Sequence, residues 1–404
     1  MSASSEASGP LSGIRVLDIG TLLAGPWGAT LLGDFGAEII KVEQPGSGDP
    51  LRGAMRKGEA GQPINWAIDA RNKKSITLNL REAAGQALLR DLVLHADVLF
   101  ENFTPGTMER WGLAWETLHA LNPRLIMVRV SGYGQTGPYA ERPGYDRIAL
   151  GFSGYMYPTG FPDRFPVRPA FPTADYNTAT FGAYAAMLAL YHRDAGGGEG
   201  QLIDLALYEA PFRITSNLVA GWTRNGENRE RIGNRNPGFS PAGTFETKDK
   251  RYLQIAAGGD NVWRRLTYAM ERPELADDER YLTSRDRIEH ADELEAMLSA
   301  WIADHNFDDV MDLLVEKGVP AGGIYRAQDI ADDPHFAARE SLIEVEDPQH
   351  GAVPMPGVVP KLSASPGAVH STGPRLGAHN EDIYGGLLGL SPEALSRLQE
   401  AGTI

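Results

Sequence analysis

The chain of 404 residues contains no cysteine. This absence excludes disulfide bonds, thiolate nucleophiles and cysteine-ligated metal sites. No apolar run approaches the roughly 18 residues that a membrane span needs. The first residues, MSASSEASGPLSG, lack the basic and apolar regions of a secretory signal. The sequence therefore predicts a cytoplasmic protein that has no membrane partner.

Basic residues are also few, since 38 Lys and Arg stand against 53 Asp and Glu and give a formal net charge of -15. Nucleic acid is therefore not expected as a partner. An anionic ligand would need a local group of basic side chains. Candidates near predicted strand ends are Arg71, Lys73, Lys74, Arg81 and Arg110. The alternative is that these side chains are simply solvated.

Several catalytic motifs are missing as well. No GxGxxG string follows the first predicted strand, so NAD is not expected, and no GxSxG elbow indicates a serine hydrolase. The nine histidines show neither HExxH nor HxH spacing. A bound metal is therefore not expected.

What the first half does contain is a regular alternation of short apolar runs and helical stretches. Strands are predicted at 14–20, 37–43, 74–80, 97–102 and 124–134. Such alternation is typical of α/β proteins in which helices cover a parallel sheet. The fold class is therefore predicted as α/β, with a Rossmann-like large domain.

The second half of the chain differs in composition from the first, and this change predicts a division into separate parts. The predicted parts are a disordered tail at 1–10, the large domain at 11–224, a linker at 225–243, a smaller α+β domain at 244–330, and a return segment at 331–404 that completes the large domain. In the smaller domain a β-hairpin is predicted to turn at Lys248–Lys250. The Pro-rich stretch 344–377 is predicted to be weakly structured.

The string AFPTADY places Asp175 where an irregular segment enters a long helix of small and apolar residues. Aspartate is a favoured helix N-cap because its oxygen accepts free backbone N–H groups. The same position suits a carboxylate nucleophile, because a helix N-terminus favours the ionised form. The residues alone leave both roles open. The string AAGGDN, which contains Gly258 and Gly259, is either a plain turn or a cover for a substrate.

Several strings along residues 10–390 belong together, among them IRVLDIGTLLAGPWG, NKKSITLNL, DVLFENFTPGTMERWGL and PTADYNTATFGAYAA. Taken together they resemble the class III CoA-transferases, a family that includes formyl-CoA transferase and is related to α-methylacyl-CoA racemase. The resemblance implies transfer of CoA from an acyl-CoA to a free carboxylic acid. Coenzyme A or acyl-CoA is then a substrate, and no cofactor is permanently bound. The resemblance also implies a homodimer of interlocked subunits.

The resemblance further assigns roles to individual residues. Asp175 corresponds to the nucleophile, which would form an aspartyl anhydride and then an aspartyl-CoA thioester. Gly258 and Gly259 correspond to a loop that covers the site and keeps water out. The positions that correspond to CoA-binding residues are Leu23, Ala24, Leu78, Arg81, Asn102, Phe103, Arg110 and Tyr145. Leu23 replaces a glutamine of formyl-CoA transferase, which counts against oxalate and formate as substrates.

Two other functions are alternatives to CoA transfer. The first is racemisation next to the thioester, for which racemase relatives use a histidine where this chain has Tyr145. A phenol, with an ordinary pKa of about 10, is a poor base at neutral pH. The second is non-catalytic acyl-CoA binding. For CoA transfer, the candidate acids are small dicarboxylates such as succinate, mesaconate, itaconate, citramalate or malate, and succinyl-CoA or another dicarboxylyl-CoA is one candidate donor. Arg147 or Arg168 is a candidate partner for a second carboxylate.

Overall fold

The computed structural model describes residues 9–53 and 63–404, which divide into two compact units. The larger unit comprises the chain up to Tyr155 together with Arg168–Leu218 and Ala337–Ile404. The smaller unit comprises Met156–Val167 and Val219–Phe336. The stretch Met156–Val167, placed in the large domain by the sequence, thus belongs to the smaller unit. Most of the predicted tail at 1–10 lies outside the described residues.

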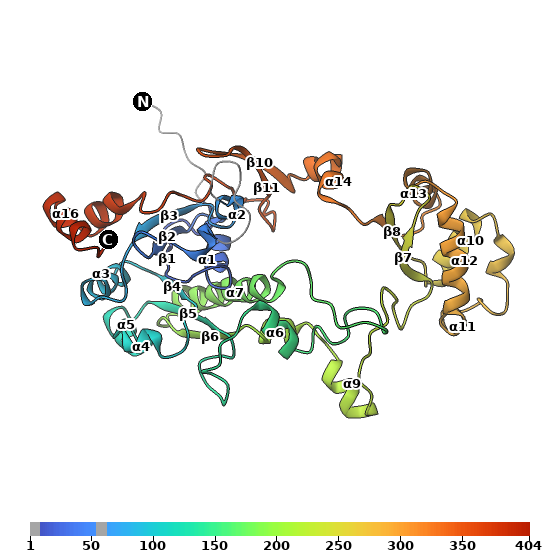
Figure 1. Ribbon diagram of the computed structural model, residues 1–404, viewed down its shortest axis with the longest axis horizontal. Coiled ribbons are helices and arrows are strands. Elements are labelled where there is room, and N and C mark those ends of the chain that lie inside the picture. Colours follow the sequence, from blue (N-terminus) through green and yellow to red (C-terminus); the bar gives the residue numbers. More distant parts are fainter. Residues whose placement is uncertain (1–8, 54–62) are drawn as a thin grey trace. The chain divides into compact units, whose positions relative to one another are not determined.

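In the described part of the larger unit, six strands form one sheet in the order β3-β2-β1-β4-β5-β6. Every neighbouring pair is parallel, as predicted. The strands are β1 (Arg15–Asp18), β2 (Glu38–Glu43), β3 (Lys73–Thr77), β4 (Val98–Glu101), β5 (Ile126–Ser131) and β6 (Leu202–Ala206). Nearly all their residues except those of β6 are buried, because helices cover both faces of a parallel sheet. Figure 1 shows the blue strands β1 to β3 continuing into the cyan and green strands β4 to β6.

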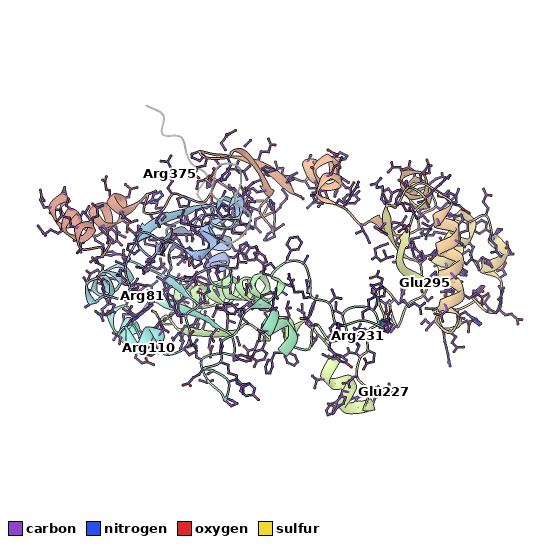
Figure 2. All side chains as sticks on the ribbon, viewed as in Figure 1. Arg81, Arg110, Glu227, Arg231, Glu295 and Arg375 are labelled. Carbon is purple, nitrogen blue, oxygen red and sulfur yellow. The ribbon has the colours of Figure 1, made fainter. Side chains whose placement is uncertain are left out.

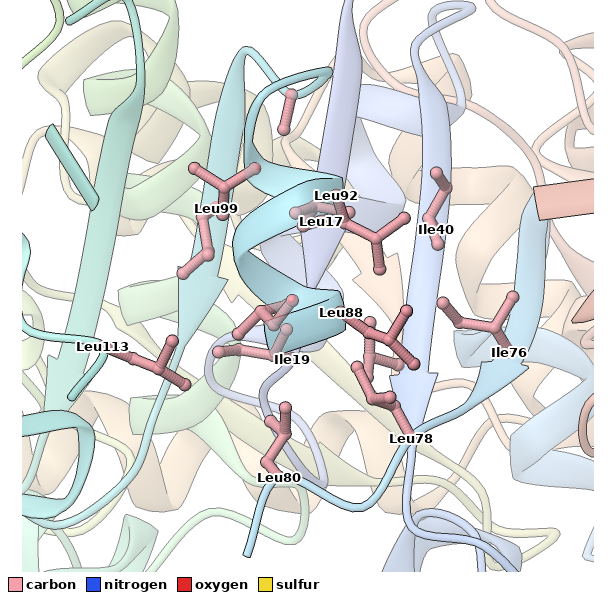
Figure 3. Packing of buried hydrophobic residues seen from close by; sticks show 14 of the residues in the cluster. Leu17, Ile19, Ile40, Ile76, Leu78, Leu80, Leu88, Leu92, Leu99 and Leu113 are labelled. Atoms are coloured by element: carbon pink, nitrogen blue, oxygen red, sulfur yellow. The ribbon is translucent and has the colours of Figure 1, made fainter. Parts of the chain in front are cut away.

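The main core lies between one face of this sheet and helices α3 (Ala83–Val93) and α5 (Trp115–Leu121). In Figure 3, Leu92 of α3 lies beside Leu17 of β1, and Leu88 of the same helix lies closer to Ile19. Full burial of each leucine side chain contributes roughly 1.5–3 kcal/mol. The leucines of α3, three and four residues apart, therefore fix this helix on the sheet.

The opposite face of the sheet carries α1 (Pro26–Gly33) and the long helix α7 (Thr173–Ala195). The two helices approach closely at Gly28, where a Cβ atom would lie 2.9 Å from the carbonyl oxygen of Ala179 and 2.9 Å from the Phe100 ring. Only glycine leaves room for this approach. This glycine thereby lets α7 pack directly on α1.

Shorter elements complete the larger unit. They are η1 (Pro50–Arg52), α2 (Ile64–Asp69), α4 (Thr107–Arg110), α6 (Asp146–Phe152) and α8 (Glu209–Arg213), followed in the return segment by β10 (Leu342–Asp347), β11 (Gly351–Pro356), a π-helix η3 (Glu381–Leu387) and α16 (Pro392–Glu400). The prediction of weak structure over 344–377 is therefore wrong in part. Most of β10 and all of β11 lie in this stretch and form an antiparallel hairpin.

The smaller unit has an antiparallel sheet of β7 (Ala242–Glu246), β8 (Tyr252–Ala256) and β9 (Ala321–Gly323). The predicted hairpin turn at Lys248–Lys250 is confirmed. Its helical elements are α10 (Asp260–Ala269), η2 (Pro273–Ala276), α11 (Ser284–Glu289), α12 (Ala291–Ala303), α13 (Phe307–Glu316) and α14 (Ala327–Asp332). Two helices, α9 (Leu218–Asn225) and α15 (Pro334–Ala338), span the boundaries between the units in the sequence. Among the described residues, none of the helices is long and apolar enough to cross a membrane.

Candidate active site

A cavity of about 260 Å³ opens at the carboxyl ends of the strands in the larger unit. Its walls come from the ends of four neighbouring strands and include Thr21, Glu43, Leu78 and Phe103. The strand order reverses between β1 and β4, and open α/β sheets bind ligands in the crevice at such a point. Of the predicted CoA-binding residues, the structure brings Leu78, Arg81 and Phe103 to this cavity.

A buried ion-pair network holds the β1 side of the cavity. Lys41 Nζ lies 2.9 Å from Asp49 Oδ2 and 3.4 Å from Asp18 Oδ1, and it also donates to the carbonyl oxygen of Gly20. Lys73 Nζ lies 2.8 Å from the other oxygen of Asp18. Burial opposes the charge of Lys41, but these carboxylates raise its pKa above the ordinary value. The lysine therefore stays charged and fixes the backbone at Gly20.

Asn102 fixes the loop that follows β1. Its Oδ1 accepts the Thr21 N–H at 2.7 Å, and its Nδ2 donates to the Thr21 carbonyl oxygen at 2.7 Å. The next residue, Leu22, has a left-handed φ of 62°, uncommon for a bulky side chain, and its N–H donates to Asp49 Oδ1 at 3.1 Å. The side chain of Asn102, predicted to contact CoA, is thus engaged in holding a strained loop.

Glu43 ends β2, a position from which an acidic residue often binds ribose in dinucleotide sites. Here both carboxylate oxygens have partners inside the protein. Arg52 donates to them through Nε at 2.7 Å and Nη2 at 2.8 Å, Ser75 Oγ lies at 2.6 Å and the Asp49 N–H at 2.9 Å. Because Arg52 neutralises it, Glu43 adds no unpaired negative charge to the cavity.

Three of the basic side chains considered as an anion-binding patch are paired with carboxylates. The pairs are Arg71–Asp34 at 2.6 Å, Lys73–Asp18 at 2.8 Å and Lys74–Glu38 at 2.7 Å. The hypothesis that these three offer free charge to an anion is wrong.

Arg81 and Arg110 differ from these three. Within residues 9–53 and 63–404, neither forms an ion pair, and Arg110 donates to Thr107 Oγ1 at 2.8 Å. Figure 2 shows the two arginines on the same side of the larger unit in that view. They are the guanidinium groups of the predicted set that remain available for a phosphate.

Asp175 is the third residue of α7 and does not cap it. The N-cap is Pro172, which has no side-chain acceptor. Instead Asp146, the first residue of α6, accepts the N–H of Ala174 at 2.7 Å through Oδ1, which also lies 3.4 Å from the N–H of Asp175. Of the two roles that the sequence left open for Asp175, the cap of its own helix is therefore wrong, because a carboxylate from another helix takes these donors.

The carboxylate of Asp175 is half-buried, and no hydrogen bond or ion pair joins it to any residue that the structure describes. Burial, and then the negative charge of Asp146, raise its pKa to about 7. Perturbed carboxyl groups of this kind occur frequently at functional sites. When ionised, this carboxylate is more basic than an ordinary aspartate and has its lone pairs free for attack.

The neighbouring Tyr176 connects α7 to a second perturbed carboxyl group. Its hydroxyl donates to Asp69 Oδ2 at 3.4 Å, and burial raises the pKa of Asp69 to about 6. Asp69, Tyr176 and Asp146 were not predicted from the sequence. The position of Asp146 directly after Tyr145 was the one available signal, since no spacing rule connects Asp69 with α7.

The loop after β1 runs from the cavity to the first turn of α7. Gly20 and Thr21 line the cavity. Leu23 belongs to a buried hydrophobic cluster, and Leu22 and Tyr176 both pack against that cluster. Leu23 and the following Ala24, both predicted to lie near CoA, are buried. One short loop thus borders the cavity and shares a hydrophobic cluster with the residue adjacent to Asp175.

The other predicted residues of the larger unit lie around the start of α6 and α7. Tyr145 is the N-cap of α6 and its side chain is 68% exposed. Arg147 is exposed on the same helix. Arg168 Nη1 donates to the carbonyl oxygen of Pro169 at 2.9 Å. Their roles remain predictions.

Gly258 and Gly259 belong to the smaller unit, between β8 and α10. A Cβ atom on Gly258 would lie 2.7 Å from the Phe239 ring, whereas one on Gly259 would meet nothing within 4 Å. The buried Arg287 donates to the Gly258 carbonyl oxygen at 2.7 Å. Gly258 is therefore fixed by packing, and Gly259 is the residue of this loop with open space around it.

The sheet order, the cavity at its reversal point and the unpartnered aspartate are typical of an α/β enzyme that binds a nucleotide-containing ligand. Among the described residues, no group of three or more His, Asp or Glu could hold a metal ion. A family model of CoA-transferase family III matches residues 11–380. The chain belongs to this family, and its enzyme class is class III CoA-transferase.

Individual relatives match over nearly their whole length. The chain is 47% identical to succinyl-CoA–D-citramalate CoA-transferase of Chloroflexus aurantiacus, over 96% of this chain and 97% of that protein. It is 44% identical to the alpha subunit of succinyl-CoA–L-malate CoA-transferase of the same organism, over 96% and 91% respectively. A CAIB/BAIF family protein from Brucella suis has a similar structure, with a TM-score of 0.84, 36% identity, and coverage of 94% of this chain and 100% of that one.

Proposed function

We propose that this enzyme transfers CoA from succinyl-CoA, or another dicarboxylyl-CoA, to a free carboxylic acid through covalent intermediates on Asp175. The observation that most directly supports this proposal is the position of the loop from Gly20 to Ala24. It borders a cavity at one end, and its Leu23 belongs to the hydrophobic cluster against which Tyr176, the residue next to an unpartnered carboxylate, also packs. The two relatives above are named for succinyl-CoA as donor and a hydroxydicarboxylic acid as acceptor.

In the proposed first half-reaction, an oxygen of the Asp175 carboxylate attacks the donor thioester carbon. The C–S bond breaks, CoA leaves as the thiolate, and a mixed aspartyl anhydride forms. The thiolate then attacks the aspartyl carbonyl of the anhydride. The donor acid leaves as a carboxylate, and an aspartyl-CoA thioester remains.

The second half-reaction mirrors the first. The acceptor carboxylate attacks the aspartyl carbonyl and expels the CoA thiolate, which forms a second anhydride. The thiolate attacks the acceptor carbonyl of this anhydride and expels the Asp175 carboxylate. No net proton is transferred in either half-reaction. The reaction therefore needs an ionised Asp175 and the exclusion of water rather than an acid–base pair. Gly259, with open space around it, is the proposed flexible point of the covering loop.

A trapping experiment tests this proposal. The protein is incubated with a panel of acyl-CoAs, quenched with hydroxylamine or borohydride, and the peptide that contains Asp175 is analysed by mass spectrometry. We expect a modification that depends on the acyl-CoA, is strongest with a dicarboxylyl-CoA and is absent in Asp175→Ala. If no donor gives an adduct and the protein instead exchanges the α-proton of an acyl-CoA for deuterium, racemisation replaces CoA transfer as the function.

We also propose that the enzyme is a homodimer. Tyr184, Leu188 and Tyr191 of α7 are 58%, 53% and 74% exposed. Their spacing places them on one face of the helix, and apolar patches of this kind often mark interfaces. Light scattering should give the mass of a dimer for the wild type and of a monomer for a Tyr184→Glu and Leu188→Glu double variant. A wild-type monomer would contradict the proposal.

A further inference from the structure

The first turn of α7 carries the Asp175 carboxylate, which has no hydrogen bond to any residue that the structure describes. The orientation of this carboxylate therefore depends on how firmly the turn itself is held. The backbone N–H groups of a first helical turn have no partners within the helix, so such turns fray unless other groups hold them. One anchor is Asp146, which accepts the N–H of Ala174 at 2.7 Å. The residue that follows Asp175, Tyr176, supplies a second one.

The ring of Tyr176 is held by apolar contacts with other segments of the larger unit. It packs edge-to-face on Trp27 of α1, with ring centroids 4.9 Å apart at 76°. It also packs against the buried cluster that contains Leu23 and Trp66. These contacts use the ring and not the hydroxyl. Replacement of Tyr176 by phenylalanine therefore removes the hydroxyl alone.

The hydroxyl of Tyr176 donates to Asp69 Oδ2 at 3.4 Å, at the end of α2. Within residues 9–53 and 63–404, the Asp69 carboxylate has no other hydrogen bond and no ion pair. Burial, and then the charge of Asp69, raise the pKa of Tyr176 above its ordinary value, so the phenol remains a donor. The acceptor is fixed as well, because Thr30 Oγ1 of α1 donates to the Asp69 carbonyl oxygen at 2.6 Å.

We infer that Tyr176 and Asp69 are positioning residues, whose hydrogen bond fixes the first turn of α7 and so orients the Asp175 carboxylate for attack. The inference rests on the proposed function, because it takes Asp175 as the nucleophile. A nucleophile must lie about 3–3.5 Å from the carbon that it attacks, and a displacement of about 1 Å can lower the rate a hundredfold. Because the carboxylate must stay free to react, its alignment comes from the backbone. Asp146 and Tyr176 hold this backbone on either side of Asp175.

The test is a double-mutant cycle on the hydrogen bond. Tyr176→Phe removes the donor, Asp69→Leu removes the acceptor, and the double variant removes both. Asp69→Asn keeps an acceptor oxygen and is the rescue variant. Tyr191→Phe is the matched control, because it makes the same change on the same helix at a side chain that is 74% exposed. The kcat and KM are measured for transfer from succinyl-CoA to D-citramalate or L-malate, whichever the wild type uses faster.

We expect Tyr176→Phe and Asp69→Leu each to lower kcat about tenfold, with KM nearly unchanged, because the contacts with the substrate are intact. The double variant should lose no more than either single variant, and Asp69→Asn should match the wild type. An unchanged kcat in Tyr176→Phe, a rise in KM in its place, or losses that add in the double variant would overturn the inference. Thermal unfolding verifies that each variant is folded. If Asp69→Leu does not fold, Tyr176→Phe and Asp69→Asn decide the question by themselves.

A measurement without substrate separates this inference from the proposed function. Hydrogen exchange of the backbone amides of residues 174–177 should be about twofold to tenfold faster in Tyr176→Phe than in the wild type, because one hydrogen bond is lost. It should be unchanged in Asp69→Asn. If the wild type transfers CoA from no donor, the proposed function fails while hydrogen exchange still decides whether Tyr176 fixes the turn. Equal exchange in Tyr176→Phe and the wild type would contradict the inference.

Discussion

Asp146 Oδ1 lies 3.4 Å from the backbone N–H of Asp175 and 2.7 Å from that of Ala174. The carboxylate of α6 thereby caps the helix that carries Asp175. Its negative charge also adds to the effect of burial and raises the pKa of Asp175 to about 7. One side chain thus frees the carboxylate of Asp175 from capping and makes it more basic.

The first prediction concerns the pH dependence of the reaction. Because attack needs the ionised carboxylate, kcat/KM for acyl-CoA should rise with pH through about 7 and then level off. Asp146→Asn removes the like charge while its amide oxygen still caps α7, so the rise should move to lower pH. Initial rates from pH 5 to 9 provide the measurement. A rise at the same pH in both proteins would show that Asp146 does not tune the nucleophile.

The second prediction concerns stability. The pKa of Asp175 in the folded protein is raised to about 7, above the value of about 3.9 in an unfolded chain. Ionisation of Asp175 therefore lowers the free energy of unfolding. This loss of stability is absent below pH 4 and complete above pH 7. Asp175→Asn should raise the free energy of unfolding by on the order of 2 kcal/mol at pH 8 and by little at pH 4. Urea titrations at the two pH values provide the measurement. An equal gain in the free energy of unfolding at pH 4 and pH 8 would contradict the prediction.

The third prediction concerns the phosphates of coenzyme A. Arg81→Gln should raise the KM for acyl-CoA about tenfold, because a charge-assisted contact with phosphate is lost. The increase should shrink at high salt, which screens such contacts. Arg124→Gln is the control, since Arg124 is exposed, pairs with Asp194 at 2.6 Å and lies outside the cavity lining. Equal KM values for the two variants would remove Arg81 from CoA binding.

The fourth prediction distinguishes the two glycines of the smaller unit. Gly258→Ala should lower the free energy of unfolding by about 1–3 kcal/mol, because its Cβ would lie 2.7 Å from the Phe239 ring. Gly259→Ala should leave the melting temperature nearly unchanged, since a Cβ there meets nothing within 4 Å. If Gly259 gives the covering loop its flexibility, this variant should also hydrolyse acyl-CoA faster relative to transfer. Equal stability of the two variants would contradict the packing argument.

The sequence predicted the parallel sheet because most of its strands are short apolar runs bounded by polar or glycine residues, although β3 begins with two lysines and a serine. The periodicity of side-chain burial along an element depends on the residues of that element alone. The start of α1 at a proline and the hairpin turn at Lys248–Lys250 are also set by neighbouring residues in the sequence. The return segment was less predictable. Its hairpin β10–β11 lies in a Pro-rich stretch, where local composition argues against strands.

The sequence by itself determined the α/β class, the absence of thiol chemistry and, through a family resemblance, the candidate role of Asp175. Tertiary structure alone decided which polar groups are free. Lys73 is paired with Asp18 and Asn102 with Thr21, whereas Arg81 and the Asp175 carboxylate have no such partner among the described residues. The physical reason is that each pairing joins segments far apart in the chain, and only the folded sheet brings their atoms within hydrogen-bonding distance.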